Sequence, residues 1–226
     1  MAKKVSIAID GPAGAGKSTI ARRLAKELGY YYVDTGAIYR TVAYFFDLWG
    51  INPKDLDGIT RYIDELTIGI EYDEEGGQHM IMNGMDVTDD IRTQEIGQKA
   101  SLVSAHAIVR ELLLDMQRGM AQEHDVVMDG RDIGTVVLPK ATVKIFLTAS
   151  PEVRARRRTN ELAAKGQKAN CEQILKEIQQ RDYQDTHREI APLKMARDSI
   201  KLDTSEMDID GVIAAIKDIV AKKVAP

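Results

Sequence analysis

The sequence predicts an α/β fold in which helices cover both faces of a five-stranded parallel sheet. Short apolar runs alternate with helical patterns along most of the chain, as in strands joined by right-handed helical crossovers. Two of the runs are compact and apolar, as strands buried on both faces usually are. The five predicted strands are residues 5–10, 30–34, 126–129, 143–147 and 200–203. Ligands of such sheets bind at the carboxyl ends of the strands, so the residues after each run are the first site candidates.

The first predicted unit is a strand, a glycine-rich turn and a helix. Apolar residues alternate with small ones over 5–10, which favours a short buried strand. After the turn, apolar residues recur four apart until Gly29, a residue type that commonly ends a helix. The second unit is the strand at 30–34 and a helix at 37–49, which another glycine closes.

The middle of the chain departs from this alternation of strands and helices. A short helix is predicted at 59–66, and beyond it apolar residues alternate with polar ones around glycine-rich turns, which indicates a hairpin. The alternating residues are Ile68, Ile70, Tyr72, Met80 and Met82. We interpret the methionines as packing on one sheet face rather than as a binding surface. The pattern predicts a small antiparallel β insertion within 60–105, in a core formed by 1–59 and 106–226.

Helical patterns fill most of the second half. The predicted ranges are 93–124 with a bend near 104–107, 151–166, 170–181 and 209–220. Ser150 and Pro151 suit the cap and first position of one helix, and Asn170 with Gln173 resembles a capping box. Residues 154–168 are predicted to form a short helical lid.

Composition excludes several classes of protein. The chain has 226 residues, 44% of them hydrophobic and 29% charged, and one Cys. This apolar content is too high for a disordered chain, and we expect Cys171 to be a free thiol in a reducing compartment. The sequence has no stretch near the roughly 20 apolar residues of a membrane span and no signal-peptide core at its start. We expect a cytoplasmic protein with no membrane contact, and the formal charge of -4 argues against nucleic acid as a partner.

The turn after the first strand matches the pattern G-x-x-x-x-G-K-S. Its glycines let the backbone fold around an anion with N–H groups pointing inward, and its lysine reaches the β- and γ-phosphates of a nucleotide. The predicted ATP-binding residues are Gly11, Pro12, Ala13, Gly14, Ala15, Gly16, Lys17, Ser18 and Thr19. Ser18 is a candidate Mg²⁺ ligand, although the Ser18-Thr19 pair leaves open which hydroxyl approaches the ion. Asp129 ends an apolar strand, where it would either orient Mg²⁺ through water or play a structural role.

Arginines follow several predicted strands and helices. Arg40 lies after the second strand and Arg131 directly after the third. Two helical faces carry further groups, namely Arg154, Arg157 and Arg158 on one and Arg181, Asp185 and Arg188 on the other. Phosphoryl transfer depends mainly on positioning and on neutralising oxygen charge, which arginine forks supply. The chain is small and lacks the N/T-K-x-D motif of GTPases, so it favours transfer to a small anionic acceptor. Alternatively, the first arginine face is solvated and held by ion pairs.

Several segments of the chain are similar to one known family. They are GPAGAGKST, DTGAIYR, IRTQE, DGRDIGTVV, VKIFLTAS, the pair Arg157-Arg158, and RDYQDTHR followed by APL. Together they resemble bacterial cytidylate kinases, which are P-loop nucleoside monophosphate kinases, and they run in order from residue 7 to about residue 205. DTGAIYR, DGRDIGT and RDxxDxxR are far more specific than the phosphate loop. The predicted β insertion also fits, since this family carries an extra small sheet.

The resemblance implies transfer of the γ-phosphoryl group of MgATP to CMP or dCMP on a P-loop kinase core. By similarity, Lys17 would follow the transferred group, while Arg40, Arg131 and Arg188 would hold the acceptor phosphate. Arg157 and Arg158 would close over the ATP phosphates and exclude water.

The resemblance also implies a set of residues that read the nucleoside. Ser101, Arg110 and Asp132 would read the cytosine, whose amino group needs a carboxylate and whose two acceptors need donors. Uracil would place an acceptor against that carboxylate, so UMP is expected to be the poorer substrate. The remaining acceptor contacts would come from Arg181 and Asp185 to the ribose, and from Thr35 and Tyr39. A plain core role for Tyr39 is an equal alternative.

Two other functions are compatible with the phosphate loop. The nearer one is a P-loop kinase for UMP, AMP or a hydroxyl acceptor such as shikimate, which the Ser101, Arg110 and Asp132 set disfavours. The other is a non-catalytic nucleotide-binding module, against which Lys17 and Arg131 argue. The four His are scattered without the spacing of a metal site. Charge on most helices favours a monomer.

Overall fold

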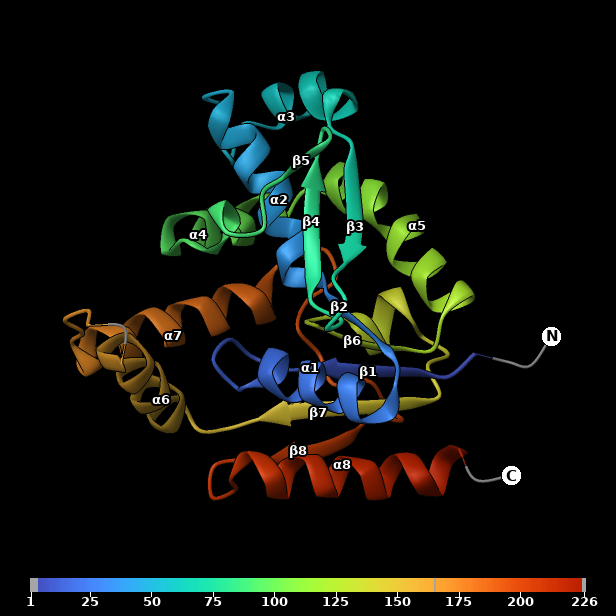
Figure 1. The fold of residues 1–226 in the computed structure, drawn as a ribbon. Coiled ribbons are helices and arrows are strands. Elements are labelled where there is room, and N and C mark those ends of the chain that lie inside the picture. Colours follow the sequence, from blue (N-terminus) through green and yellow to red (C-terminus); the bar gives the residue numbers. More distant parts are fainter. Residues whose placement is uncertain (1–3, 165, 225–226) are drawn as a thin grey trace.

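The structure is a computed structural model that describes residues 4–164 and 166–224. Its centre is a five-stranded sheet in the order β2-β6-β1-β7-β8, in which all neighbouring strands are parallel (Figure 1). The strands are β1 (Ser6–Asp10), β2 (Tyr31–Asp34), β6 (Val126–Gly130), β7 (Val143–Thr148) and β8 (Ile200–Asp203). The predicted parallel sheet is confirmed, and the bounds of each strand lie within about one residue of those predicted.

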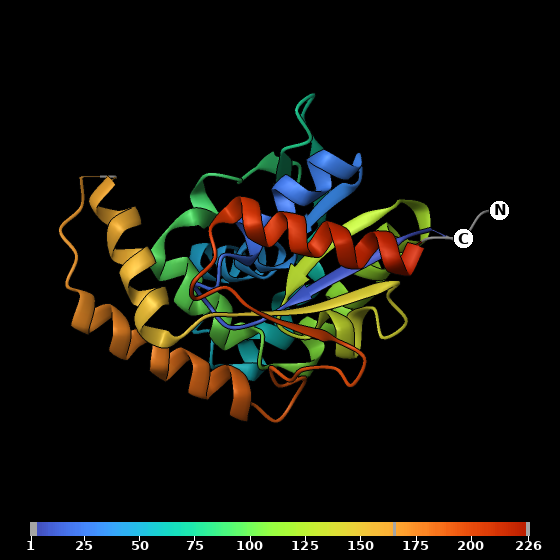
Figure 2. The same ribbon diagram turned by 90° about the horizontal axis from the view of Figure 1, so that it is seen from below.

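Helices cover both faces of the sheet, as predicted. One face carries α1 (Lys17–Leu28) and α8 (Ile209–Val224), and the other carries α2 (Thr35–Leu48) and α5 (Ala107–Glu123). Alternate residues of β1 point to opposite faces, so Ile7 and Ile9 pack with α1 and α8 whereas Ala8 packs with α2 and α5. Figure 2 shows α8 lying along its face of the sheet. Each face therefore has its own apolar core, with β1 between them.

A second, antiparallel sheet lies beside α2 (Figure 1). Its strands, in spatial order, are β3 (Ile68–Tyr72), β4 (Gln78–Met82) and β5 (Met85–Asp86). The helical segments around it are α3 (Leu56–Tyr62), 3₁₀ turns at Ile63–Glu65 and Asp90–Arg92, and α4 (Gln94–Val103). Met80 and Met82 are buried in the α2 core, so the predicted packing of the methionines is confirmed. The antiparallel insertion is also confirmed, while its treatment as a separate domain stays a prediction.

Several helix boundaries differ from the predicted ones for local reasons. The helix predicted at 59–66 starts earlier because the Asp55 carboxylate caps it, accepting the Gly58 N–H at 3.1 Å. The bent helix predicted at 93–124 is two helices, and the Ser104 hydroxyl donates back to the Ser101 carbonyl at the break. The helix predicted to continue through Arg181 extends to His187, since neither glycine nor proline interrupts it.

Helices α6 (Pro151–Ala164) and α7 (Cys171–His187) form a hairpin that projects from the core (Figure 2). It has a small apolar cluster of its own, centred on Ala155, Ile174 and Ile178. Asn170 caps α7 by accepting two backbone N–H groups, but the Gln173 side chain bonds Glu177 and so does not complete the capping box. The predicted lid at 154–168 lies in this hairpin, except for residue 165, which is outside the described residues.

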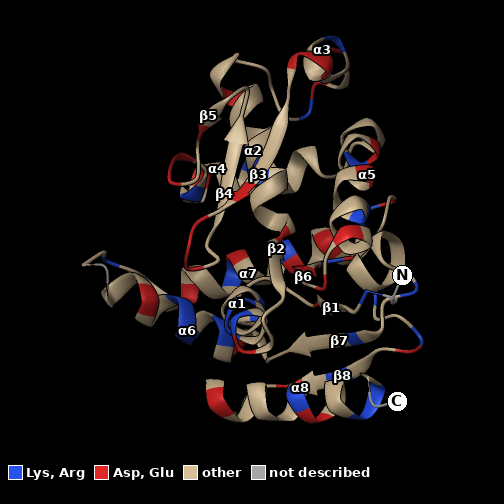
Figure 3. Ribbon diagram, turned by 45° about the vertical axis from the view of Figure 1, so that its right-hand side comes forward, with Lys and Arg blue, Asp and Glu red and all other residues tan. Residues whose placement is uncertain are grey.

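The surface carries charges of both signs. Figure 3 shows Lys and Arg interspersed with Asp and Glu on most of the helices. In the described part of the chain, none of the helices combines the length and the apolar composition needed to cross a bilayer.

Candidate active site

The phosphate loop between β1 and α1 depends on glycine. Gly11, Gly14 and Gly16 have φ angles of 151°, 75° and 87°, which residues other than glycine rarely adopt. A Cβ on Gly11 would also lie 1.9 Å from the Leu147 carbonyl oxygen of β7. Helix α1 begins at Lys17, so its N-terminal N–H groups adjoin this loop. The result is a cradle for an anion, as the sequence pattern predicts.

Lys17 is buried beside the loop. Its Nζ donates a hydrogen bond to the Pro12 carbonyl at 2.9 Å. Burial, together with the positive charge of Arg131, lowers the pKa of the Lys17 ammonium to about 7. A phosphate bound next to Lys17 would favour the charged ammonium again.

A polar cluster surrounds Asp129 at the end of β6. Its carboxylate accepts hydrogen bonds from the Ser18 hydroxyl at 3.0 Å and the Tyr32 hydroxyl at 2.9 Å. The Thr35 hydroxyl donates to the Asp129 carbonyl at 2.7 Å. Burial and the nearby Asp34 carboxylate raise the pKa of Asp129 to about 6. The sequence offers no signal for Tyr32, because its neighbours are also tyrosines of an apparent strand.

Ser18 and Asp129 provide hard oxygen ligands at the phosphate loop, which suits Mg²⁺. Among the residues described, no three His, Cys, Asp or Glu side chains are arranged to hold a metal ion by themselves. Mg²⁺ in phosphate-transfer sites usually takes one or two protein ligands and completes its shell with water and phosphate oxygens. The residues present therefore fit an ion that is bound together with a nucleotide.

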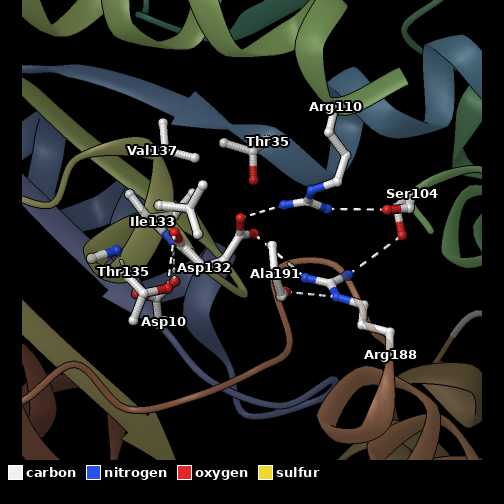
Figure 4. A network of polar contacts seen from close by, with 12 residues as sticks. Asp10, Thr35, Ser104, Arg110, Asp132, Ile133, Thr135, Val137, Arg188 and Ala191 are labelled. Atoms are coloured by element: carbon white, nitrogen blue, oxygen red, sulfur yellow. Dashed lines mark hydrogen bonds and ion pairs between the residues drawn. The ribbon is translucent and has the colours of Figure 1, made fainter. Parts of the chain in front are cut away.

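Asp132 lies between two arginines (Figure 4). Arg110 of α5 contacts one carboxylate oxygen directly, and Arg188 lies 3.5 Å from the other. Both arginines also bind Ser104, since Arg110 donates to its carbonyl at 3.1 Å and Arg188 to its hydroxyl at 3.5 Å. Arg188 is held further by the Ala191 carbonyl at 2.7 Å. The cluster offers one carboxylate beside two groups of N–H donors.

Tyr39 and Ser101 adjoin this cluster. The Arg110 guanidinium lies 5.6 Å from the centroid of the Tyr39 ring, and burial raises the pKa of Tyr39 to about 12. Tyr39 also packs against the apolar core around α2, as the core alternative predicts, while its contact with the acceptor stays a prediction. Ser101 lies one turn before Ser104, and its backbone carbonyl accepts a hydrogen bond from the Ser104 hydroxyl at 2.9 Å. The sequence analysis missed Ser104, whose only signal is its place at the helix break.

A second group of arginines is close to Lys17. Arg131 donates to the Asp185 carboxylate at 2.9 Å and is the main positive neighbour of both Lys17 and Arg181. Burial and the charge of Arg131 lower the pKa of Arg181 to about 10. Arg40 forms an ion pair with Asp34 at 3.2 Å. The fold thus concentrates positive charge where the strands end.

Three of these arginines carry buried nitrogen atoms without hydrogen-bond partners. Five buried side-chain atoms in the described residues lack a hydrogen bond, and three of the five are Arg40 Nε, Arg181 Nε and Arg188 Nη2, the last of which lies 3.5 Å from the Asp132 carboxylate as an ion pair. A buried donor without an acceptor is costly, and native structures contain few of them. The atoms mark a place where an anionic ligand would supply the missing acceptors.

The arginines of α6 have different roles from one another. Arg154 is buried, donating to the Ala13 carbonyl of the phosphate loop at 3.0 Å and to both carboxylate oxygens of Asp182 at 3.0 and 2.6 Å. Arg157 donates to the Thr204 carbonyl at 2.6 Å, and Arg158 pairs with Glu161 at 2.8 Å. Arg158 is therefore held by an ion pair in this structure, which agrees with the alternative interpretation of this arginine face. The lid roles of Arg157 and Arg158 stay predictions, and the loop contact belongs to Arg154, which was not among the predicted site residues.

Asp10, at the end of β1, is a further residue that the sequence analysis missed. Its carboxylate accepts the N–H groups of Ile133 and Gly134, both at 2.7 Å. It thereby ties the phosphate-loop strand to the segment that carries Arg131 and Asp132, which continues as a turn of π-helix at Ile133–Val137 (Figure 4). Burial raises the pKa of Asp10 to about 6. The only signal for Asp10 in the sequence is that an acidic residue ends an apolar strand and precedes a glycine.

Known proteins resemble this chain along nearly its whole length. A family model described as cytidylate kinase matches residues 7–222. A cytidylate kinase of Lactobacillus johnsonii is 49% identical over 97% of this chain and 95% of its own. One of Carboxydothermus hydrogenoformans is 48% identical over 96% of this chain and 97% of its own. The solved structure of an uncharacterised protein from Eubacterium ventriosum has a TM-score of 0.52 at 13% identity, covering 97% of this chain and 99% of that one, and supports the fold alone.

Proposed function

The chain belongs to the cytidylate kinase family and transfers the γ-phosphoryl group of ATP to CMP or dCMP, and from this premise we propose how its side chains carry out the reaction. The observation that carries the proposal is the set of buried guanidinium nitrogens on Arg40, Arg181 and Arg188 that make no hydrogen bond. A nucleoside monophosphate brings phosphate, ribose and base acceptors in one molecule, and so provides partners for all three.

ATP binds with its phosphates in the loop of residues 11–18. The loop N–H groups and Lys17 hold the β- and γ-phosphates, and Lys17 remains with the transferred group as charge shifts to the leaving oxygen. Arg154 supports the loop from outside through the Ala13 carbonyl. Arg157 and Arg158 exchange their present partners for ATP phosphates when the α6–α7 hairpin closes, which excludes water.

Arg40 and Arg131 hold the acceptor phosphate, with Arg181 adding positive charge beside them. An oxygen of this phosphate attacks the γ-phosphorus, the bond to the β-phosphate oxygen breaks, and ADP leaves without a covalent enzyme intermediate. Asp185 orients Arg131 through its 2.9 Å hydrogen bond and is also placed to contact the ribose. Thr35, beside Asp129, completes the acceptor contacts.

Mg²⁺ bound by Ser18 and oriented by Asp129 would neutralise the charge that develops on the phosphate oxygens. The Ser18 hydroxyl donates to the Asp129 carboxylate, which Tyr32 also holds, so we propose that Ser18 rather than Thr19 approaches the ion.

Asp132 accepts the cytosine amino group, while Arg110 and Ser101 donate to the ring acceptors. We place Arg188 with this base-reading group rather than on the acceptor phosphate, because it lies 3.5 Å from Asp132 and shares Ser104 with Arg110. Tyr39 packs against Arg110 and holds it in this position. All these residues come from one chain, so we propose that the enzyme acts as a monomer, which sedimentation of the active protein tests.

The test is ADP release from MgATP with CMP, dCMP, UMP, AMP and GMP in parallel, with a blank that lacks an acceptor. Turnover on CMP and dCMP well above the other acceptors supports the assignment of the base-reading residues. Equal turnover on UMP would remove Asp132 from that role, and turnover in the blank would show that closure fails to exclude water.

A further inference from the structure

The insertion sheet covers the open edge of β2 with side chains instead of a strand. Strand β2 is the edge strand of the parallel sheet, and its residues 32 and 34 direct their backbone polar groups to the open side. On that side the Tyr72 hydroxyl donates to the Tyr32 carbonyl at 2.8 Å. The Gln78 side-chain oxygen accepts the Asp34 N–H at 2.7 Å. Tyr72 and Gln78 face each other across the β3–β4 pair, so one rung of the insertion makes both contacts.

The amide of Gln78 is fully engaged at this position. Gln78 is 9% exposed, and its nitrogen contacts the Asp34 carbonyl at 3.5 Å and the Met80 sulfur at 3.0 Å. The side chain therefore clamps both backbone groups of Asp34. Removing the amide leaves the buried Asp34 N–H without the acceptor that Gln78 provides.

Asp34 transmits this constraint to the acceptor site. One carboxylate oxygen caps α2 by accepting the Ala37 N–H at 2.8 Å, and the other accepts from Arg40 Nη2 at 3.2 Å. Arg40 Nε is one of the buried nitrogens without a partner. The direction in which Arg40 presents this donor thus depends on Asp34, whose backbone is fixed from the insertion.

We propose that Gln78 is a positioning residue, which sets the orientation of Arg40 toward the acceptor phosphate through Asp34. The inference rests on the proposed role of Arg40 and adds that the insertion takes part in phosphate binding without touching the substrate. A contact with a purely structural role would only stabilise the insertion. The hydrogen bond from Tyr72, the residue paired with Gln78, to the Tyr32 carbonyl has such a role.

The first test compares Gln78→Met with Tyr72→Phe, because each removes a hydrogen bond between the same two elements. We expect Gln78→Met to raise KM for CMP about tenfold, with kcat and KM for ATP changed less than about twofold. Tyr72→Phe should leave KM for CMP within about twofold of the wild type, with any effect confined to Tm. Equal effects of the two variants on KM for CMP would overturn the proposal. Gln78→Glu keeps an acceptor oxygen for the Asp34 N–H but loses the donor to the Asp34 carbonyl, so its KM for CMP should lie between those of the wild type and Gln78→Met, which also covers the case in which the Met variant folds poorly.

A double-mutant cycle with Arg40→Met separates this inference from the proposed function. Arg40→Met alone should raise KM for CMP at least tenfold, and failure there would remove Arg40 from phosphate binding. In the Arg40→Met background, Gln78→Met should change KM for CMP less than about twofold, because its effect passes through Arg40. A full additional tenfold increase would show that Gln78 acts by another route, even with the function of Arg40 intact.

Discussion

Replacing Asp132 is the most direct test of how this enzyme distinguishes cytosine from uracil. Its carboxylate is almost fully buried and contacts Arg110 and Arg188, so it is held rigidly where the cytosine amino group is proposed to bind. A hydrogen bond to a charged group contributes about 1.5–3 kcal/mol, and burial favours the upper part of this range. Asp132→Ala removes this bond for CMP and removes the repulsion of the O4 oxygen for UMP.

The expected result is a fall in the CMP-to-UMP ratio of kcat/KM by about 10- to 100-fold, since about 1.4 kcal/mol corresponds to a factor of ten. The assay is steady-state ADP release with each acceptor at saturating MgATP. Removing one partner of a buried ion pair costs about 3–5 kcal/mol of stability, so thermal unfolding must first establish that the variant is folded. Asp132→Asn serves as the milder companion, because it keeps an oxygen for Arg110.

Asp182→Asn is the matched control, since Asp182 is also paired with an arginine but lies outside the base-reading group. The CMP-to-UMP ratio of kcat/KM in this variant should equal that of the wild type. A folded Asp132→Ala enzyme with an unchanged ratio would refute the proposed base reading.

Three further predictions concern the phosphate loop and its supports. Lys17→Ala should abolish turnover while far-UV circular dichroism stays unchanged, because its buried ammonium is the loop's positive charge; appreciable residual kcat would contradict this. Burial raises the pKa of Asp10 to about 6 from the usual 3.8, so the folded protein keeps a proton that the unfolded chain releases. The contribution of Asp10 to the free energy of unfolding should therefore fall by about 2 kcal/mol as pH rises from 4 to 6. Asp10→Asn should flatten urea-unfolding stability across this window, and an equally steep dependence in the variant would assign it to other groups. Arg154→Met should lower the free energy of unfolding by about 3 kcal/mol, which is the lower end of the cost of breaking a buried ion pair because Asp182 is partly exposed. It should also raise KM for ATP, because the Ala13 carbonyl loses its hydrogen-bond donor. An unchanged KM for ATP in a folded variant would leave Arg154 with a structural role only.

The sequence predicts the sheet well because its signals are local. Alternation over 5–10, the glycine that ends α1 and the Asn170 cap each depend on residues within a few positions of one another. The phosphate loop is predictable for the same reason, since its conformation needs positive φ angles at three positions and the sequence has glycine at each of them.

The features that sequence reasoning missed depend on distant partners. No local pattern predicts the turn of π-helix after Asp132. It depends on the Asp10 carboxylate, which accepts the N–H group of Ile133, 123 residues later in the chain. Ser104 joins two arginines that no local pattern connects. Arg154 looks equivalent to Arg157 and Arg158 on a helical face, yet burial against Ala13 and Asp182 separates it from them. In each case the information lies in the packing of elements and not in the spacing of residues.

The central place of β1 also determines when this enzyme becomes competent during its synthesis. Strand β1 precedes its two neighbours in the sheet, β6 and β7, which begin only at Val126 and Val143. At translation rates of about 5–20 residues per second, β1 waits roughly 6–30 s after its own synthesis before both partners leave the ribosome. Until then the strand that leads into the phosphate loop lacks at least one of its two neighbours in the sheet.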